Sequence, residues 1–296
     1  MTALSMPTFS KAKVLVVGDV ILDRYFWGDV TRVSPEAPVP VVRVAQKTQA
    51  LGGAGNVALN IKGLGARVLL LGVRGDDSQG DYLQSLLDEH GIDHELFTTA
   101  KLPTTTKTRI LGQGQQLLRM DEEAPRPLDQ ATAATLKTRR ETALPETCAV
   151  ILSDYGKGIF LGELAAWVIQ TCRGRKLPVF VDPKGTDWER YRGATAITPN
   201  TAEFQAVAGF DPDDDAQLTA QAERTRQRFS LDWLLVTRGA RGLSLLGDAG
   251  IQPPLHIRSR AQEVFDVSGA GDTVIATLAA SVAAGVAMPQ AAEVSN

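Results

Sequence analysis

Apolar and polar residues follow two alternating patterns along most of the chain. Short apolar runs, such as residues 13–17 and 149–152, end at glycine or aspartate turns and are typical of strands buried on both faces. Longer stretches, such as residues 56–64 and 163–172, have the apolar spacing of helices. Strands that alternate with helices predict an α/β fold, a doubly wound and mostly parallel sheet flanked by helices.

The same alternation continues through the rest of the chain. Further strands are predicted at residues 68–73, 178–181, 194–198 and 233–236, and further helices at residues 80–89, 202–208, 216–229 and 273–284. Ligands of open α/β sheets bind at the carboxyl ends of the parallel strands. Turns that follow these strands are therefore the first places to look for chemistry.

Two segments break the alternation. Residues 24–44 contain three prolines and end in an alternating run at 39–44. Residues 95–120 have no helical period and predict two or three strands, most clearly at 104–111 and 115–120. We expect both segments to form one small inserted β-sheet that projects from the main sheet as a lid. The alternative, edge strands of the main sheet, stays open at this point.

Composition limits the class of protein. The 296 residues are 44% hydrophobic and 22% charged, and we expect one domain over residues 1–296. A net charge of −3 argues against a nucleic-acid-binding protein. No apolar run reaches the ~18 residues of a membrane helix, and the first twelve residues do not have the pattern of a signal peptide. Together with only two cysteines, this predicts a cytoplasmic protein without a membrane partner.

The strongest motif is DVSGAGD at residues 266–272, directly before an alanine-rich helix. Glycines at a helix start leave backbone N–H groups uncovered, and with the helix dipole these form an anion site. Asp272 on the first turn would repel an anion, so its expected role is to take a proton from a hydroxyl that attacks the anion. The structural alternative is an aspartate that only stabilises its own helix.

A second glycine-rich turn, LGGAGNVA at residues 51–58, also precedes a helix. It lacks the G-x-G-x-x-G spacing of a dinucleotide site, and the chain has no Walker-type loop. The three histidines have no metal-binding spacing, and no G-x-S-x-G elbow occurs. Acid–base chemistry is therefore left to carboxylates or lysines.

Four further turns follow predicted strands: SDYGKG (153–158), DPKG (182–185), TPNTAE (198–203) and TRGARG (237–242). The first two place Lys157 and Lys184 just beyond a strand end. Asn200 and Glu203 have the spacing of a capping box, which by itself explains both. Four such turns on one sheet edge, beside an anion site, predict a site that handles phosphate.

Residues 52–58 and 266–272 resemble the two signature regions of the PfkB (ribokinase-like) carbohydrate kinases, and the resemblance runs through the whole chain. Within the family, residues 14–23, 34–41 and 182–187 are similar to those of kinases for D-glycero-β-D-manno-heptose 7-phosphate. This implies ATP-dependent phosphorylation of the 1-hydroxyl to the 1,7-bisphosphate, a step toward ADP-heptose for the lipopolysaccharide core. The alternatives are a ribokinase-like kinase for another sugar or sugar phosphate, such as ribose or a ketohexose phosphate, and a non-catalytic sugar- or nucleotide-binding sensor.

The resemblance also implies the role of individual residues. Asp272 would be the base, and the amides of Gly269, Ala270 and Gly271 would stabilise the transferring phosphoryl group. Asn200 and Glu203 would bind Mg²⁺ through water. The other residues of the ATP site would be Lys157, Lys184, Thr201, Ala202, Thr237 and Gly239, and the sugar would contact Asp19, Asp23, Gly52, Gly53 and Asn56.

A sugar that already carries a phosphate needs cations near its far end. Lys107, Arg109 and Arg119 lie on the predicted lid strands, and Arg24 begins the other lid segment. We expect some of them to bind the sugar phosphate; solvated lid charges are the alternative. Apolar positions at 39–44 and 117–118 would be exposed on a thin sheet, which favours a homodimer through the lid.

Two departures from the family pattern stand out. Ser268 occupies a position where the family often has threonine, and the hydroxyl is kept. The sequence ends at residue 296, soon after the helix of the anion site, whereas family members usually continue with a further helix. We therefore expect the end of the kinase domain to be truncated, and we expect only the kinase step because no nucleotidyltransferase domain follows.

Overall fold

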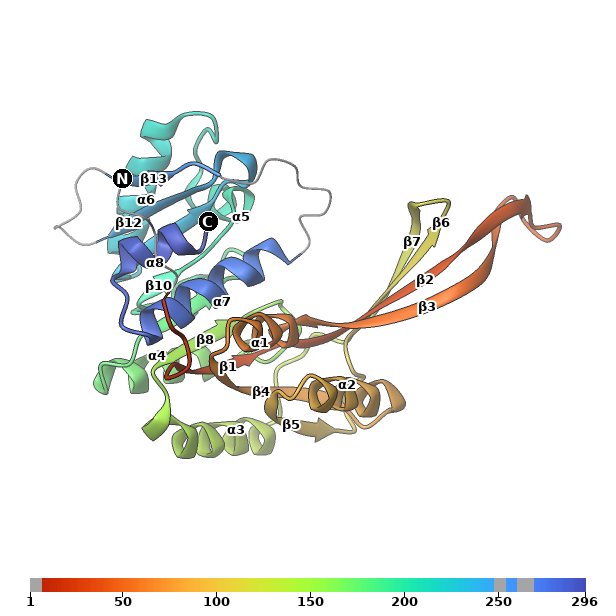
Figure 1. The fold of residues 1–296 in the computed structure, drawn as a ribbon, viewed down its shortest axis with the longest axis horizontal. Helices are drawn as coiled ribbons and strands as arrows, with labels where there is room; N and C mark the ends of the chain where they lie inside the picture. The colour runs from red at the N-terminus through yellow and green to blue at the C-terminus, as the bar shows by residue number, and fades with distance from the viewer. Residues whose placement is uncertain (1–6, 248–253, 260–268) are drawn as a thin grey trace.

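The computed structural model describes residues 7–247, 254–259 and 269–296 (Figure 1). Within these residues, nine strands form the main sheet in the order β13-β12-β11-β10-β9-β8-β1-β4-β5. Neighbours from β5 to β11 pair in parallel, while β12 and β13 are antiparallel. The strands are β1 (Lys13–Gly18), β4 (Arg67–Gly75), β5 (Asp93–Thr99), β8 (Ala149–Ser153), β9 (Val179–Asp182), β10 (Ala196–Ile197), β11 (Trp233–Thr237), β12 (Leu243–Gly247) and β13 (Leu255–Ile257). The predicted α/β fold is confirmed.

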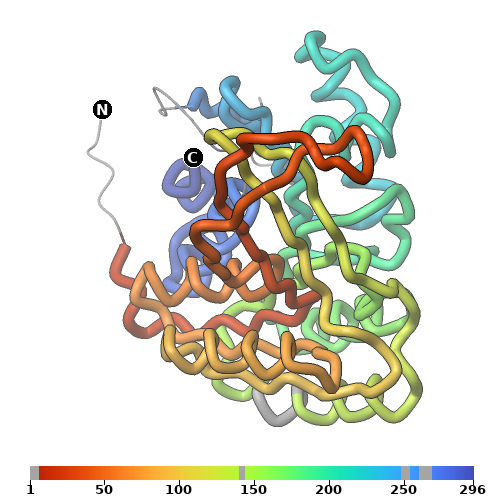
Figure 2. The backbone as a smooth tube through the Cα atoms, turned by 90° about the vertical axis from the view of Figure 1, so that its right-hand side faces the viewer, coloured from red at the N-terminus to blue at the C-terminus, as the bar shows by residue number. Residues whose placement is uncertain are grey.

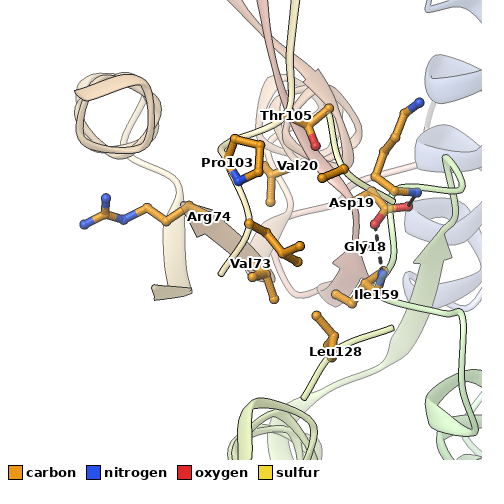
Figure 3. Close-up of a pocket in the computed structure, with 12 residues that line it drawn as sticks. Gly18, Asp19, Val20, Val73, Arg74, Pro103, Thr105, Leu128 and Ile159 are labelled. Atoms are coloured by element: carbon orange, nitrogen blue, oxygen red, sulfur yellow. Dashed lines mark hydrogen bonds between the residues drawn. The ribbon is translucent and has the colours of Figure 1, made fainter. Parts of the chain in front are cut away.

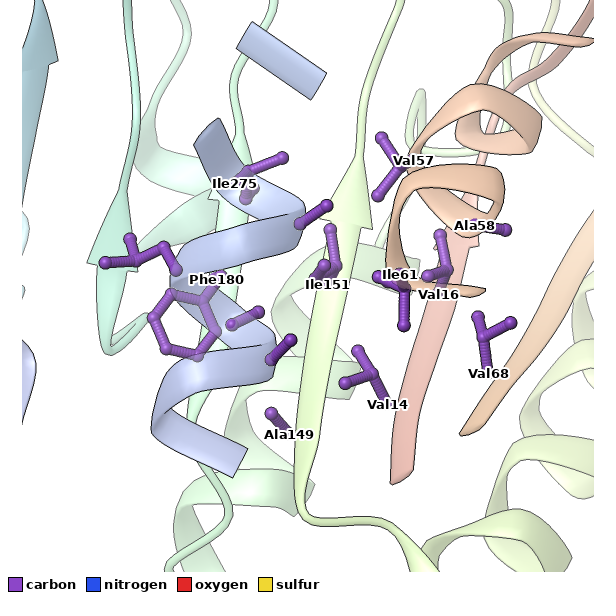
Figure 4. Close-up of a cluster of buried hydrophobic side chains, with 14 of the residues drawn as sticks. Val14, Val16, Val57, Ala58, Ile61, Val68, Ala149, Ile151, Phe180 and Ile275 are labelled. Carbon is purple, nitrogen blue, oxygen red and sulfur yellow. The ribbon is translucent and has the colours of Figure 1, made fainter. Parts of the chain in front are cut away.

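Helices cover both faces of this sheet. One face carries α1 (Ala54–Gly63), α2 (Ser78–Glu89), α7 (Ala270–Ala283) and α8 (Met288–Val294), and the other carries α3 (Gln130–Ala143), α4 (Leu164–Gly174), α5 (Thr201–Ala208) and α6 (Asp215–Arg228). Because successive strand residues point to opposite faces, Val14 and Val16 join the first core and Leu15 the second. Figure 4 shows the first core, where α1 and α7 pack side by side on β1 and β8. None of the described helices is long and apolar enough to span a membrane.

A separate small sheet projects from the body (Figure 1). In the described part of the chain it has four strands, β2 (Val20–Val33), β3 (Pro40–Gly53), β6 (Thr106–Gly112) and β7 (Gln115–Glu122), in the order β3-β2-β6-β7. Two antiparallel hairpins, β2–β3 and β6–β7, join through a parallel pairing of β2 with β6. They lie in front of the body in the rotated view of Figure 2. The predicted inserted sheet is therefore present.

The predicted bounds of the small sheet, 24–44 and 95–120, need correction. Residues 95–99 belong to β5, which pairs with β4 and forms the edge of the main sheet. Phe97 on β5 packs against the main core, and an alternating pattern does not reveal which sheet a strand joins. The first segment is also longer than predicted, because β2 begins at Val20 and β3 continues to Gly53.

Other differences concern elements that the pattern did not predict. These are α3, α8, β12 and β13, and the strand expected at 194–198 shortens to β10. Helix α3 is polar along most of its length, so its few apolar residues gave no clear period.

The small sheet joins the body through very short connections. Asp19 separates β1 from β2, and β3 runs directly into α1. The Asp19 carbonyl accepts the Ala54 N–H at 2.9 Å across this junction. Gly53 has φ 55°, and a Cβ there would lie 2.4 Å from the Asp19 carbonyl oxygen, so only glycine fits. The start of α1 is thus fixed beside the carboxyl end of β1.

Candidate active site

Asp272 stands at the centre of the edge formed by the carboxyl ends of the parallel strands. It lies on the first turn of α7 and is 5% exposed. Its Oδ2 accepts a hydrogen bond from Asn56 Nδ2 at 2.7 Å, and its Oδ1 accepts one from the Tyr155 hydroxyl. Three segments far apart in the sequence, α1, the loop after β8 and α7, therefore meet at one carboxylate.

The surroundings of Asp272 act on its charge in opposite directions. Burial raises its pKa above the usual value, while the hydrogen bonds from Tyr155 and Asn56 lower it. Asp23 raises the pKa further, and Lys107 lowers it. A buried carboxylate with a raised pKa and two fixed donors has the character of a general base.

The start of α7 offers uncovered donors beside this carboxylate. Gly269 is the N-cap with φ 80°, and no side chain caps the helix. The N–H groups of the first turn, including Ala270 and Gly271, have no intrahelical acceptor. A Cβ placed on Gly271 would meet none of the described atoms within 4 Å. Gly269, Ala270 and Gly271 therefore lie together at the start of the helix that carries Asp272, and their predicted role as an anion site stays a prediction; Asp266 and Ser268 lie outside the described residues.

The Asp19 carboxylate holds the loop that follows β8. Its Oδ2 accepts the backbone N–H groups of Tyr155 and Lys157, both at 2.9 Å. Its Oδ1 accepts the backbone N–H of Ile159 at 3.2 Å, a contact drawn in Figure 3. Burial raises the pKa of Asp19 to about 6 in spite of these donors, and Asp154 adds to the rise. The predicted contact of Asp19 with sugar hydroxyls stays a prediction.

The predicted sugar-binding residues of the small sheet meet at its base. Arg109 on β6 forms an ion pair with Asp23 on β2 at 2.5 Å. A Cβ on Gly52 would lie 2.2 Å from Asp23 Oδ2, so this glycine lets the carboxylate pack on the β3 backbone. Arg119 pairs with Asp121 at 2.9 Å and is half exposed. Asp23 is thus shared between the two hairpins.

Lys107 differs from its neighbours. It pairs with Asp23 in the β2–β6 register, but among the described residues no ion pair reaches its ammonium group. Burial lowers its pKa, and the nearby ammonium of Lys157 lowers it further. Asp23 and Asp121 raise the pKa of Lys107, so this ammonium lies among charges of both signs, and its predicted contact with the sugar phosphate stays a prediction.

Lys157 lies with the predicted sugar-binding residues. Its Nζ contacts Glu123 at 2.5 Å, and it lines a pocket of about 30 Å³ together with Asp19. Lys184 lies elsewhere, because its Nζ pairs with Glu203 Oε1 at 3.2 Å. The predicted nucleotide contact of Lys157 stays a prediction, and its surroundings group it with Lys107.

The residues expected around ATP meet at the start of α5. Asn200 Oδ1 accepts the Glu203 N–H at 2.9 Å, and Glu203 Oε2 accepts the Asn200 N–H at 3.1 Å, which is a complete capping box. Thr201 Oγ1 donates to the Thr237 carbonyl at 3.1 Å, so α5 is tied to the end of β11. Ala202 follows on the same first turn, and Gly239 begins the short helix η3 (Gly239–Arg241) after β11.

Two residues of the site were not singled out by the sequence. Tyr155 and Asp182 lie in turns where only the lysines attracted notice. Burial, together with Asp272 and Glu203, raises the pKa of Asp182 well above its usual range. Among the described residues no hydrogen bond reaches its carboxylate. The only signal that the sequence offered was position. Asp182 ends the buried strand β9, and Tyr155 lies two residues after the buried strand β8.

Comparison with known proteins adds three findings. The family model described as "pfkB family carbohydrate kinase" matches residues 11–296. The chain is 49% identical over 293 residues to the "Bifunctional protein HldE" of Pseudomonas aeruginosa and 47% identical over 294 residues to that of Aeromonas hydrophila. Each match covers 99% of this chain, and the chain spans about 60% of the length of these curated relatives.

Solved structures share the fold at low sequence identity. Escherichia coli phosphofructokinase-2 in complex with potassium has a TM-score of 0.76 at 17% identity. Arabidopsis thaliana ribokinase complexed with ribose and ATP has a TM-score of 0.73 at 18% identity. Both matches cover 95% of this chain and 89% of the solved one.

Proposed function

We propose that this chain, which belongs to the pfkB family of carbohydrate kinases, phosphorylates D-glycero-β-D-manno-heptose 7-phosphate at the 1-hydroxyl. As in a carbohydrate kinase, the phosphoryl group would come from ATP. The observation that carries the kinase chemistry is the Asp272 carboxylate, buried and held by donors beside the uncovered amides of α7. The heptose assignment rests on the 49% identity to HldE proteins over nearly the whole chain.

In the proposed reaction, Asp272 takes the proton of the 1-hydroxyl as its oxygen attacks the terminal phosphorus of ATP. The N–H groups of Gly269, Ala270 and Gly271 donate to the oxygens of the phosphoryl group in transfer. A phosphoryl transfer needs positioning and charge stabilisation more than covalent catalysis, and this arrangement provides both.

The nucleotide site would include Mg²⁺, which neutralises phosphate charge when it is bound. Among the described residues, no group of three or more His, Cys, Asp or Glu side chains is arranged to hold a metal. This fits Mg²⁺, which keeps several waters and binds through one or two carboxylates plus substrate phosphates. Glu203 and Asn200 would hold the ion through water, with Lys184, Thr201, Ala202, Thr237 and Gly239 along the nucleotide.

The sugar 7-phosphate would bind at the base of the small sheet. Lys107 carries a charge without an ion pair among the described residues, and it lies close to Lys157. An anion between these ammonium groups would relieve their repulsion. Arg109 and Arg119 lie on the same two strands but are paired with Asp23 and Asp121, so they would have to exchange these partners to reach the phosphate.

The small sheet would serve as a lid and as a dimer contact. It carries exposed apolar side chains, among them Val44 and Leu118. The outer parts of its strands project away from the described helices (Figure 1). A second copy of the same sheet would cover them. Closure over the sugar would exclude water, which competes as an acceptor.

The test is a coupled assay of ADP release with heptose 7-phosphate, fructose 6-phosphate and ribose as acceptors. We expect kcat/KM for heptose 7-phosphate to exceed the others by orders of magnitude. Asp272→Asn should lower kcat by at least about a hundredfold, the low end of the contribution of a general base. A thermal unfolding curve of the variant serves as the control for folding.

Two results would contradict the proposal in different ways. Equal or better kcat/KM with ribose or fructose 6-phosphate would overturn the heptose assignment. Wild-type kcat in Asp272→Asn would overturn the role of Asp272 as the base. ADP release that does not depend on a sugar would contradict the kinase reaction itself.

A further inference from the structure

We propose that Tyr155 is a positioning residue for the reaction: its hydroxyl holds the Asp272 carboxylate in one orientation and in the ionised form that accepts the sugar proton. The proposal rests on the proposed role of Asp272 as the base. Neither the sequence pattern nor the family signature segments point to Tyr155. It lies in the SDYGKG turn at residues 153–158, where only Lys157 was singled out.

The first argument is the geometry at the carboxylate. Asn56 on α1 donates to Oδ2, and Tyr155 in the loop after β8 donates to Oδ1. A carboxylate held by one donor can still rotate about its Cβ–Cγ bond. Donors from two rigid elements, one on each oxygen, fix its plane, and each oxygen keeps a second lone pair for the substrate.

The second argument is the way in which Tyr155 itself is held. Its backbone N–H donates to Asp19, and the next N–H, that of Gly156, donates to Asp154 Oδ1 at 2.7 Å. Asp154 in turn accepts the Tyr191 hydroxyl at 2.5 Å and is 2% exposed. The backbone that carries the phenol is therefore fixed by hydrogen bonds to two buried carboxylates, as is required of a residue that positions a catalytic group.

The third argument concerns the direction of the hydrogen bond. Burial, with the carboxylates of Asp182 and Asp272, raises the pKa of the Tyr155 phenol far above its usual value. The hydroxyl therefore keeps its proton and donates it in the hydrogen bond to Asp272. A donor to a carboxylate stabilises the charged form, which is the form that a base needs.

The charged groups around Asp272 show why this donor matters. Asp23 on β2 and Asp182 on β9 disfavour a negative charge at Asp272, and Lys107 on β6 favours it. Burial is the largest single influence and acts against the charge. Removal of one of the two hydrogen bonds would leave the carboxylate more readily protonated.

The experiment compares the wild type with Tyr155→Phe, which keeps the ring and removes the hydroxyl. We expect kcat for heptose 7-phosphate to fall about tenfold with a smaller change in KM. The acid limb of the kcat–pH profile should move upward by about one pH unit, because a lost charge-assisted hydrogen bond raises the pKa of Asp272. Tyr82→Phe is the matched control, since it removes a tyrosine hydroxyl on the exposed side of α2, and its acid limb should not move.

A second readout does not depend on turnover. In protein labelled with carbon-13 at aspartate carboxyl groups, the Asp272 resonance is identified by its loss in Asp272→Asn. We expect it to titrate at higher pH in Tyr155→Phe than in the wild type. This measurement tests the tyrosine even if the sugar assignment is wrong.

The outcomes separate clearly. An upward shift of the Asp272 titration supports the proposal whichever sugar is phosphorylated. An unmoved titration and an unmoved acid limb would overturn it, even if kcat falls. A lower unfolding temperature and a raised KM with an unmoved acid limb would show that the hydroxyl only supports the loop, which also overturns the proposal.

Discussion

At the scale of single residues, the site depends on carboxylates that the fold removes from water. Asp19, Asp182 and Asp272 all have raised pKa values, and burial is the largest cause for each. Their work differs: Asp19 holds a loop through backbone N–H groups, while Asp272 faces the open amides of α7. The role of an aspartate at this site therefore cannot be assigned from its residue type alone. It is assigned from the groups with which its carboxylate forms hydrogen bonds.

Asp19 leads to a prediction about pH and stability. The fold raises its pKa from 3.8 to about 6, so the native state favours the protonated form. Its contribution to the free energy of unfolding is present below the unfolded pKa and is lost as the pH rises through about 6. Relative to Asp19→Asn, the wild type should lose about 2 kcal/mol between pH 4.5 and pH 7.5.

Urea unfolding of both proteins at the two pH values measures this difference. In the difference between the two free energies of unfolding, the pH dependence of all other groups cancels, apart from groups coupled to Asp19. A difference that stays constant with pH, or that grows in favour of the wild type, would contradict the raised pKa.

The sequence identified part of the site at this scale. Asp272 and Asn56 follow glycine-rich turns at helix starts, and that local pattern is visible without a fold. Tyr155 and Asp182 owe their positions to pairing between β1, β8 and β9, which brings distant turns together. No local pattern reports which side chain in a turn will point at Asp272.

At the scale of elements, the small sheet is where prediction and structure differ most. The prolines and the alternating runs revealed its strands, and the two hairpins are present. The prediction that β5 belongs to the small sheet was wrong. An alternating pattern predicts a strand, but it does not determine which distant strand will pair with it. Helix α3 was missed for the opposite reason, since a mostly exposed helix shows little apolar period.

Strand β6 gives the prediction that belongs to this scale. If Lys107 binds the sugar phosphate, Lys107→Met should raise KM for heptose 7-phosphate by about 10- to 100-fold, the value of one charge-assisted contact. We expect kcat at saturation to change less than KM, because a contact with the sugar phosphate is made in the ground state and in the transition state alike. Steady-state kinetics over a range of sugar concentrations measures both constants.

Lys47→Met is the matched control for the same sheet. Lys47 lies on β3 with its ammonium 5.1 Å from the centre of the Phe26 ring, and it is exposed. Its loss should leave KM unchanged. If Lys107→Met and Arg109→Ala both leave KM for the sugar phosphate unchanged, the proposed phosphate contact is wrong.

At the scale of the whole molecule, the layered body explains stability, and the small sheet is the surface that we propose for association. The central strands are buried on both faces between two hydrophobic cores. By contrast, every residue of β7 is exposed, and Leu118 is 53% exposed. An apolar sheet left open to water on an otherwise well-covered protein is a typical contact surface.

We therefore predict a dimer that depends on this sheet. Leu118→Lys should shift the protein from dimer to monomer in sedimentation equilibrium at micromolar concentration, because a charge would be buried in the contact. Tyr82→Lys, on the exposed side of α2, is the control and should leave the mass unchanged. A wild-type protein that stays monomeric at tens of micromolar would contradict the prediction.

The short junctions around Asp19 and Gly53 have a consequence for exchanging parts between kinases. Since β3 continues without a linker into the helix that carries Asn56, a graft of the small sheet alone would also reset the angle at which that amide reaches Asp272. A chimera that exchanges this hairpin must therefore cut within β1 and after α1, so that Asn56 moves together with β2 and β3. The β6–β7 hairpin lies outside that segment and would have to be exchanged separately, so the two hairpins of the small sheet can be varied independently.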